Sequence, residues 1–407
     1  MRTMFTERHR QSLFSRHSTR RPSLPGARIV CHALVAFLIL LLAACTETVT
    51  TQALPTASTT GATGTGTPSA TATTGTGGGG NGNGGSGGSG SSRTVYIGSS
   101  DGTVYAVNAA NGAKRWQIPV GGLANKPIVV AGVVYVATDG GHVAALGSGS
   151  SLWNVTPGGS FEGRPAVDNN LVFVGSDNHS LYALGAGDGS VHWSYATGGS
   201  ITSSPATANG LVYTGSADGY LYAVHESDGS LAWKTKLTTD VEFTSPAVAN
   251  GVVYIGDDGG VLAAVNAASG AIIWSSQAAG AQIGGRPAVV NGLIYFGASN
   301  QRVYAVHASD GTPAWSYTTA ESVLSTPNVS NGVVYIGDNS TLYALNATNG
   351  HLLWQKSSNS GRSWPSINSG VVFMGTTDGT LYAFDGGDGH THWSFHAASG
   401  LGSPQVG

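Results

Sequence analysis

Residues 204–233 read SPATANGLVYTGSADGYLYAVHESDGSLAW, and the turn signals in this stretch decide the fold. They are the pairs Asn209-Gly210, Asp218-Gly219 and Asp228-Gly229. Asn, Asp and Gly tolerate the positive φ that tight hairpin turns require, so each pair predicts a hairpin. Apolar and aromatic residues fill the segments between the pairs too densely for a sheet with one solvated face. The stretch therefore predicts four antiparallel strands, joined by three hairpins and covered on both faces.

This unit recurs along residues 93–407. A tryptophan returns every 37 to 41 residues, and a proline follows it with the same period. Eight units of about 39 residues, each with four strands, match the size of propeller blades. The two series are Trp116, Trp153, Trp193, Trp233, Trp274, Trp315, Trp354 and Trp393, and Pro127, Pro165, Pro205, Pro246, Pro287, Pro327, Pro365 and Pro404.

The two ends of the repeat region complement each other. The segment 94–98 (TVYIG) matches the second strand of a unit but has no first strand before it. The segment 403–406 (SPQV) matches 204–207 (SPAT), where a first strand begins. Closing a ring in this way removes exposed strand edges. The sequence predicts an all-β fold, an eight-bladed β-propeller of four-stranded antiparallel blades in which the N- and C-terminal strands close one blade.

The repeat resembles that of the quinoprotein-type, or PQQ-like, propellers. Ala106, Asn108, Gly112 and Trp116 match the family pattern Ala-x-Asp/Asn-x-x-x-Gly-x-x-x-Trp, and the resemblance covers residues 93–407. In seven units the Trp stands ten positions after this Ala, whereas in the second unit Trp153 stands eight positions after Ala145. The resemblance implies that all eight repeat tryptophans pack between adjacent blades.

Quinoprotein dehydrogenases share this repeat, so an enzyme that uses pyrroloquinoline quinone is one alternative. The resemblance implies for such enzymes a calcium ion held by carboxylate and amide groups, a catalytic Asp and, in many members, a vicinal disulfide. This chain has two cysteines, Cys31 and Cys45, which are not adjacent, and its units carry no long insertions. Its aspartates recur at the hairpins, which indicates turn chemistry. We predict no catalytic residue and no bound cofactor, the quinone included.

The first 45 residues read as an export signal. Scattered arginines precede an apolar run at 33–42, and the tetrapeptide Leu42-Ala43-Ala44-Cys45 ends it. This tetrapeptide resembles the lipobox of bacterial lipoproteins, in which the Cys is lipidated and begins the mature chain. An uncleaved membrane helix is the alternative, but spanning takes about 20 apolar residues. We predict a signal peptide at 1–45, lipidation of Cys45, and a lipoprotein on the extracytoplasmic face that contacts the membrane through this anchor alone.

Two further features follow from composition. Residues 46–92 are almost entirely Thr, Ala, Gly, Ser and Pro, which predicts a disordered tether before the propeller at 93–407. After Cys45 the chain has eleven basic and twenty acidic residues and no Lys/Arg cluster. A phosphate backbone is held by a basic patch, so nucleic acid is not an expected partner.

The connection that leads into each proline varies between units, and in this architecture it reaches the rim of the central channel. The residues immediately before the prolines are Lys126, Arg164, Ser204, Ser245, Arg286, Thr326, Trp364 and Ser403. Arg pairs with carboxylates through two hydrogen bonds, and Trp adds flat apolar area. We predict a binding face for a protein or another anionic extracellular ligand, made of Lys126, Arg164, Arg286, Arg362 and Trp364. The alternative is a set of solvated loop charges, neutralised by Glu162, Glu242 and Glu321.

Three histidines near the C-terminus raise the question of a metal site. His390, His392 and His396 could lie along one face of an outer strand, because side chains two apart point the same way. Imidazoles placed in this way bind transition metals. Polar residues on an outer strand also protect an exposed edge from mispairing. We favour the second interpretation and predict no metal site.

By organisation the chain resembles the BamB family, the propeller lipoproteins of outer-membrane β-barrel assembly. Both combine a lipobox, a tether and an eight-bladed ring without catalytic apparatus. The resemblance implies a non-catalytic, lipid-anchored, protein-binding scaffold, and we expect a monomeric domain. The alternative from another class is an extracellular ligand sensor or adhesin, in keeping with the long tether.

Overall fold

The computed structural model describes residues 93–124, 126–241, 244–359 and 363–407. The predicted signal peptide at 1–45 with its Cys45, the predicted tether at 46–92, Glu242 and Arg362 lie outside these residues. Within the described ranges the chain consists of strands, turns and irregular segments and contains no helix. The prediction of an all-β fold is therefore confirmed.

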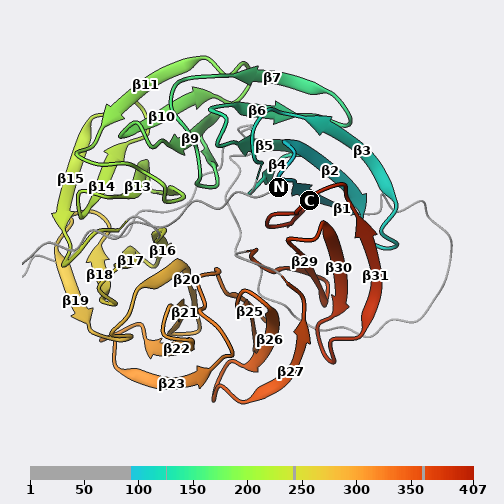
Figure 1. The fold of residues 1–407 in the computed structure, drawn as a ribbon. Coiled ribbons are helices and arrows are strands. Elements are labelled where there is room, and N and C mark those ends of the chain that lie inside the picture. The colour runs from blue at the N-terminus through green and yellow to red at the C-terminus, as the bar shows by residue number, and fades with distance from the viewer. Residues whose placement is uncertain (1–92, 125, 242–243, 360–362) are drawn as a thin grey trace, which may run out of the picture. The chain divides into compact units, whose positions relative to one another are not determined.

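The strands form eight four-stranded antiparallel sheets that follow one another around a ring, which confirms the predicted eight-bladed propeller (Figure 1). The fourth strand of each blade lies on the outer rim (Figure 1). From inside outwards, blade 1 consists of β32 (Gln405–Val406), β1 (Thr94–Gly98), β2 (Thr103–Asn108) and β3 (Lys114–Pro119); blade 2 of β4 (Ile128–Val130), β5 (Val133–Ala137), β6 (Val143–Leu146) and β7 (Ser151–Val155); blade 3 of β8 (Ala166–Asp168), β9 (Leu171–Gly175), β10 (Ser180–Gly185) and β11 (Val191–Ala196); and blade 4 of β12 (Ala206–Ala208), β13 (Leu211–Ser216), β14 (Tyr220–His225) and β15 (Leu231–Lys236).

The second half of the ring repeats this order. Blade 5 consists of β16 (Ala247–Ala249), β17 (Val252–Gly256), β18 (Leu262–Asn266) and β19 (Ile272–Ser276); blade 6 of β20 (Ile283–Val290), β21 (Leu293–Ala298), β22 (Arg302–His307) and β23 (Pro313–Thr318); blade 7 of β24 (Asn328–Ser330), β25 (Val333–Gly337), β26 (Thr341–Asn346) and β27 (Leu352–Ser357); and blade 8 of β28 (Ser366–Asn368), β29 (Val371–Gly375), β30 (Thr380–Asp385) and β31 (Thr391–His396).

Blade 1 is shared between the two ends of the described chain, as the sequence predicts. β32 pairs antiparallel with β1, with Val406 opposite Val95 and Gln405 opposite Tyr96. The backbone N–H of Thr94 donates to the carbonyl oxygen of Gly407 at 3.1 Å, and a 2.9 Å hydrogen bond runs back from Gly407 to Thr94. The C-terminus therefore closes the ring and leaves no free inner edge on β1.

The three turn signals of the repeat form the expected hairpins. In blade 4, Asn209 and Gly210 have φ of 53° and 77°, the conformation that favours Asn and Gly. Asp218 and Asp228 each accept, at Oδ1, a hydrogen bond from the backbone N–H two residues further on, at 3.1 and 2.9 Å. The repeated aspartates therefore cap turns, and their recurrence has a structural cause.

Each repeat tryptophan reaches across to the next blade. Trp233 in β15 donates from Nε1 to the carbonyl oxygen of Ala267 in blade 5 at 3.0 Å. Its ring covers Gly270, whose φ is +74° and where a Cβ would lie 2.7 Å from ring carbons. At the shortened turn of blade 2, a Cβ at Gly149 would lie 3.8 Å from Trp116. Both contacts of Trp233 recur at Trp153, Trp193, Trp274, Trp315, Trp354 and Trp393.

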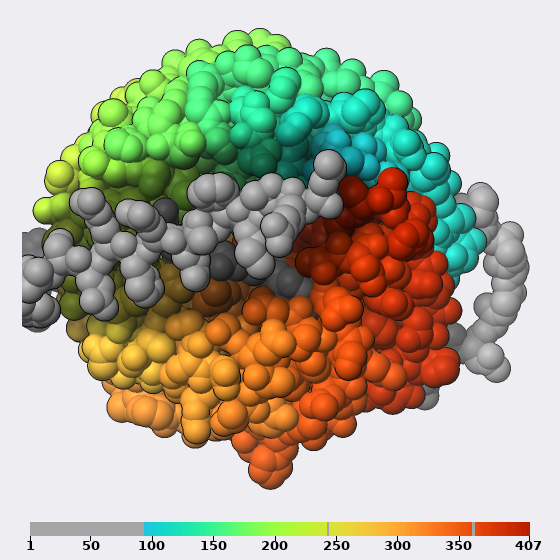
Figure 2. Space-filling view, in the orientation of Figure 1, coloured from blue at the N-terminus to red at the C-terminus, as the bar shows by residue number. Residues whose placement is uncertain are grey.

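The hydrophobic core is distributed among the blade interfaces. Buried apolar side chains form eight clusters, and each cluster joins two neighbouring blades. Figure 2 shows adjacent blades packed side by side, with the last blade against the first. Both faces of every sheet are therefore covered, which explains why the strand sequences are apolar at consecutive positions.

Deletion of residues 403–407 tests the closure. It removes β32, its backbone hydrogen bonds to β1 and its packing, and each such bond contributes about 1 kcal/mol. We expect the free energy of unfolding to fall by about 2–4 kcal/mol, measured by denaturant titration. The control Val406→Thr keeps the strand, its backbone hydrogen bonds and Gln405, and should lose much less stability than the deletion. Equal stability of the deletion variant and the parent would contradict closure by β32.

Two glycines of blade 5 separate backbone strain from the contact with tryptophan. Gly251 has φ +76° with no atom near its missing Cβ, whereas Gly270 has φ +74° and faces Trp233. We expect Gly251→Ala to cost about 1 kcal/mol of unfolding free energy and Gly270→Ala about 1–3 kcal/mol more, from overpacking. Trp233→Ala should cost about 3–5 kcal/mol. If urea titrations give the two glycine variants the same stability, the ring contact contributes nothing.

Candidate binding site in the central channel

The residues before the eight repeat prolines stand where each blade begins at the channel. Four of them have hydroxyl side chains, and each hydroxyl accepts a hydrogen bond from the backbone N–H at the same position of the preceding blade, at 2.8–2.9 Å. We call these four residues the hydroxyl belt: Ser204, Ser245, Thr326 and Ser403. Sequence reasoning missed this role, although the recurrence of Ser and Thr before proline was its visible signal.

The remaining positions carry the long side chains of the predicted binding face. Lys126, Arg164 and Trp364 line one cavity of about 90 Å³ together with residues of β32, among them Gln405. Arg286 does not line that cavity, but its charge acts on Arg164. Residues from blades 2, 3, 6 and 8 are thus brought together around the channel, and they are 38 to 238 positions apart in the chain.

Arg164 extends from the start of blade 3 towards blade 1. Its Nη2 donates a hydrogen bond to Oε1 of Gln405 in β32. Its Nε is buried and has no hydrogen-bond partner. Burial, and after it the charge of Arg286, lowers the pKa of Arg164 to about 10. The guanidinium therefore stays protonated at neutral pH despite its poor solvation.

Arg286, in β20 of blade 6, is also a buried arginine at the channel. Its Nη2 donates to the carbonyl oxygen of Pro205 at 2.9 Å and lies 3.5 Å from that of Ser204. Its Nε is also buried without a partner. Burial lowers the pKa of Arg286 to about 10, so this side chain too is a cation at neutral pH. Both arginines thus use neutral acceptors from a blade two places away.

Lys126 and Trp364 form a second contact across the channel. The Nζ of Lys126 lies 4.6 Å from the centroid of the Trp364 ring, a cation–π geometry. The backbone N–H of Trp364 donates to the Ser403 hydroxyl at 2.8 Å, which fixes the start of this residue. The indole therefore presents a positioned aromatic face beside two basic side chains.

No carboxylate neutralises the two arginines in the described part of the chain. In blade 8, by comparison, Nε2 of His392 lies 3.6 Å from Oδ2 of Asp385, away from both arginines in the sequence. Glu162 and Glu321 are exposed, and neither is paired with a described basic residue. A cation removed from water without a counter-charge costs several kcal/mol. The channel is therefore a place where an incoming anion would be stabilised.

The three C-terminal histidines do not form one cluster. His390 precedes β31, and its backbone N–H donates to the turn residue Asp388 at 2.7 Å. His392 faces Asp385, while the ring of His396 lies 3.2 Å from the Thr380 hydroxyl. Among the described residues, no group of three or more His, Cys, Asp or Glu side chains is arranged to hold a metal ion.

The lining of the channel cavity also bears on the quinone alternative. A calcium ion of the kind that the quinoprotein resemblance implies needs carboxylate and other oxygen ligands. Among the described residues, those that line the cavity include no Asp or Glu. The side chains at this place therefore do not fit a calcium–quinone pair.

The described residues contain no helix long and apolar enough to cross a membrane. The family of the chain is identified by its similarity to known proteins. The outer membrane protein assembly factor BamB of Yersinia pestis is 39% identical over 98 residues, which are 22% of this chain and 25% of that protein. The aligned stretch thus spans a quarter of that relative's length.

Solved structures share the fold at lower identity. BamB from Moraxella catarrhalis superposes with a TM-score of 0.60 at 17% identity, covering 68% of this chain and 89% of that one. Quinohemoprotein alcohol dehydrogenase ADHIIG from Pseudomonas putida HK5 gives a TM-score of 0.57 at 17% identity, covering 68% of this chain and 66% of that one.

The family described as outer membrane protein assembly factor BamB matches residues 57–148, 144–277, 217–363 and 323–406. With nearly the whole propeller matched, the chain belongs to the family of the outer membrane protein assembly factor BamB.

Proposed function

We propose that this protein is a non-catalytic, lipid-anchored scaffold on the extracytoplasmic face of a membrane, and that it binds a partner protein at the mouth of its channel. The name of its relatives refers to outer-membrane protein assembly, and the same class of role is proposed here. The binding face consists of Lys126, Arg164, Arg286 and Trp364, together with Arg362, which lies outside the described residues. Its preferred ligand is an acidic segment of the partner.

The observation that carries this proposal is the pair of guanidinium groups that no carboxylate of the described residues neutralises. Arg164 and Arg286 are charged at neutral pH, each keeps a buried Nε without a partner, and both lie at the channel. A carboxylate can take two parallel hydrogen bonds from one guanidinium, through Nε and an Nη. An acidic side chain entering the channel would supply both the missing acceptor and the missing charge.

Trp364 adds an apolar contact surface to the basic side chains of this face. Interfaces draw much of their binding energy from Trp, Tyr and Arg at desolvated positions. Trp364 and Arg164 line the same cavity, with the Lys126 ammonium above the indole ring. A peptide segment with an acidic and an apolar residue would satisfy both halves of the cavity.

The arginine pair is tested by neutral substitution. We expect Arg164→Gln with Arg286→Gln to reduce capture of envelope proteins on the immobilised, purified domain, and to weaken its salt dependence. Each lost charge-assisted hydrogen bond is worth about 1.5–3 kcal/mol of binding. The thermal melting temperature should stay level or rise, because two buried charges have been removed.

The control for this experiment is Lys114→Gln on the outer strand β3, where the lysine is exposed. It should leave both capture and melting unchanged. Mass spectrometry of the captured proteins separates the alternatives. Barrel-assembly proteins support the scaffold, whereas surface or adhesion proteins, or a polysaccharide found by sugar analysis of the same eluate, favour a sensor or adhesin. Undiminished capture by a well-folded double variant would eliminate this face as the site.

The lipid anchor is tested on the full chain expressed in a bacterium with lipoprotein processing. We expect mass spectrometry to find a mature N-terminus at Cys45 that carries lipid, because the preceding Leu-Ala-Ala matches a lipobox. Cys45→Ser should move the protein from the membrane fraction to the soluble fraction. Cys31→Ser, within the predicted signal peptide, is the control and should stay anchored. An unmodified Cys45, or cleavage elsewhere, would refute the anchor.

A further inference from the structure

One position of the repeat marks an unusual interface. Six blades carry Tyr directly before the repeat Ala of their third strand, where blades 2 and 5 have Ala144 and Ala263. The six are Tyr105, Tyr182, Tyr222, Tyr304, Tyr343 and Tyr382. At three interfaces this Tyr packs on a ring of the preceding blade, with centroids 5.6 to 5.9 Å apart. The position therefore normally fills the gap between two blades with an aromatic side chain.

The facing residue, two positions after the repeat tryptophan, decides whether the gap is filled from the other side. In the three aromatic pairs it is Tyr195, Tyr317 or Phe395. Opposite Ala144 it is Ile118, which is buried and fills the space from blade 1. Opposite Ala263 it is Thr235. The interface between blades 4 and 5 is thus the one where both facing positions are small.

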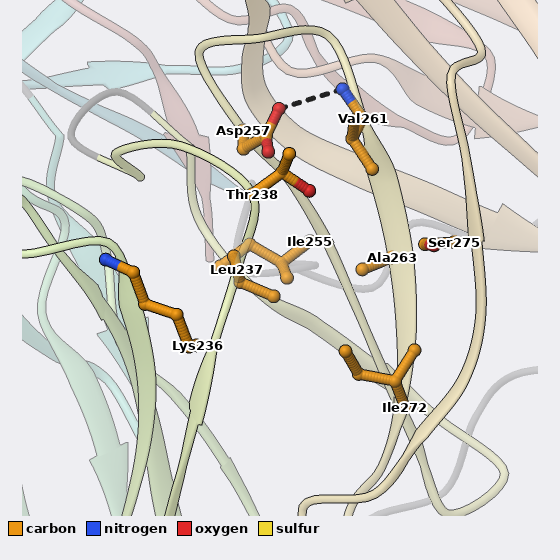
Figure 3. Close-up of a pocket in the computed structure, with 9 residues that line it drawn as sticks. All are labelled: Lys236, Leu237, Thr238, Ile255, Asp257, Val261, Ala263, Ile272 and Ser275. Atoms are coloured by element: carbon orange, nitrogen blue, oxygen red, sulfur yellow. Dashed lines mark hydrogen bonds between the residues drawn. The ribbon is translucent and has the colours of Figure 1, made fainter. Parts of the chain in front are cut away.

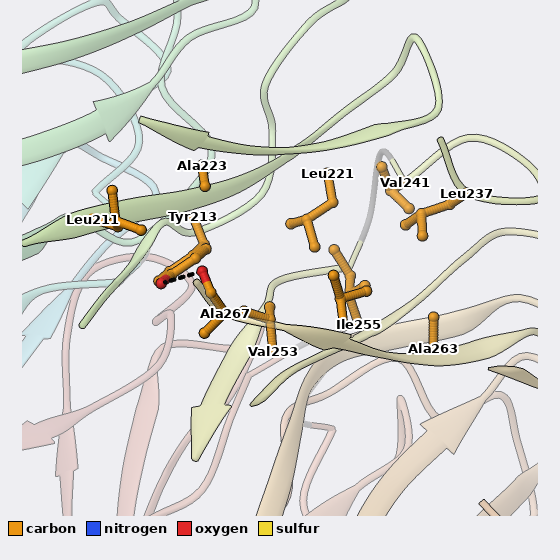
Figure 4. Packing of buried hydrophobic residues seen from close by; sticks show 11 residues of the cluster. Leu211, Tyr213, Leu221, Ala223, Leu237, Val241, Val253, Ile255, Ala263 and Ala267 are labelled. Atoms are coloured by element: carbon orange, nitrogen blue, oxygen red, sulfur yellow. Dashed lines mark hydrogen bonds between the residues drawn. The ribbon is translucent and has the colours of Figure 1, made fainter. Parts of the chain in front are cut away.

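A cavity of about 170 Å³ occupies this place (Figure 3). Its floor is formed by the buried residues Leu237, Ile255 and Ala263 of the interface cluster (Figure 4). Its mouth is lined by exposed residues, among them Thr238 and Ile272, so it opens to the outside. An apolar cavity of about 150 Å³ is known to hold a benzene ring. The space is therefore large enough for one aromatic ring.

Blade 7 shows what polar groups accompany the ring when the tyrosine is present. There Tyr343 donates its hydroxyl to Oδ2 of the buried Asp338 at 2.9 Å. The same oxygen accepts the backbone N–H of Glu321 at 3.1 Å, and the tyrosine oxygen accepts that of Ala320 at 3.0 Å. A phenol hydroxyl at this position thus has one hydrogen-bond acceptor, the Asp338 carboxylate, and one donor, the backbone N–H of Ala320.

Blade 5 keeps the equivalent groups without the tyrosine. Asp257 stands directly after the strand glycine, as Asp338 does in blade 7, and is 1% exposed. Its Oδ2 accepts the backbone N–H of Thr239, the counterpart of Glu321, at 3.2 Å. Thr238, the counterpart of Ala320, lines the cavity together with Asp257. The cavity therefore retains the polar partners of a phenol hydroxyl beside an apolar floor.

From this geometry we propose that the cavity between blades 4 and 5 binds the phenol ring of a tyrosine side chain from a partner polypeptide. The ring occupies the space beside Ala263, over Leu237 and Ile255, and its hydroxyl donates to Oδ2 of Asp257. This second site lies at an interface between blades, is separate from the channel, and needs none of its basic residues. A scaffold with two sites can hold one partner at two points or two partners at once.

The experiment uses para-cresol, which is the side chain of tyrosine, as the probe on the purified propeller. We expect saturable binding by ligand-observed NMR or calorimetry, and about tenfold weaker binding of toluene, which lacks the hydroxyl. Ala263→Tyr fills the space from within, so it should abolish cresol binding and raise the melting temperature. N-acetyltyrosine amide should compete with cresol, which separates a peptide side chain from a free phenol as the ligand.

Two controls keep the result interpretable. Tyr343→Ala opens the equivalent space in blade 7 and should create a second cresol site, with melting partly restored by cresol. The double variant Arg164→Gln with Arg286→Gln should bind cresol like the parent, so failure of the channel proposal does not affect this one. The proposal is overturned if the parent binds no cresol, if Ala263→Tyr binds it equally, or if the tyrosine amide does not compete.

Discussion

The contact between a tryptophan ring and the glycine of the next blade is the constraint on which this propeller depends. At Gly270 a side chain would meet the indole of Trp233 at 2.7 Å, and the φ of +74° independently favours glycine. The indole N–H ties the same turn through a carbonyl oxygen at 3.0 Å. Each turn is thus shaped by the blade before it. The repeat Ala-x-Asn-x-x-x-Gly-x-x-x-Trp contains both partners of this contact, because the Trp of one blade packs on the Gly of the next.

This dependence of each blade on its neighbour makes closure necessary. An open row of blades would leave one tryptophan face and one inner strand edge exposed, and exposed edges favour mispairing. β32 removes the inner edge by pairing with β1, and Trp393 of blade 8 donates to Ala109 of blade 1 at 3.1 Å. Closure also brings eight equivalent positions around one axis. The hydroxyl belt uses half of them to join neighbouring blades, which leaves the others free to vary.

Variation is tolerated where an interface has several independent contacts. The interface of blades 4 and 5 keeps its tryptophan contact and a buried cluster that includes Tyr213, Leu221, Val253 and Ile255. Loss of the tyrosine at Ala263 therefore leaves a local cavity without undoing the blade. The same reasoning applies to the channel, where Arg164 and Arg286 carry buried charge that the rest of the ring can support. Both proposed binding sites are places where the repeat departs from its own pattern.

The sequence alone determined the fold, because turn pairs, strand composition and the Trp and Pro periods are local signals that repeat eight times. It also indicated ring closure from the match of 403–406 to 204–207, and it singled out Lys126, Arg164, Arg286 and Trp364 as departures from the repeat. Only the tertiary structure decided how these side chains are placed and what they contact. The buried, unpaired state of Arg164 depends on Gln405 and Arg286, which are distant in sequence. The space beside Ala263 is bounded by Leu237 and Thr238 of another blade as well as by residues of its own. Such contacts depend on side-chain volume and charge summed across the ring, and no single unit of the repeat contains that information.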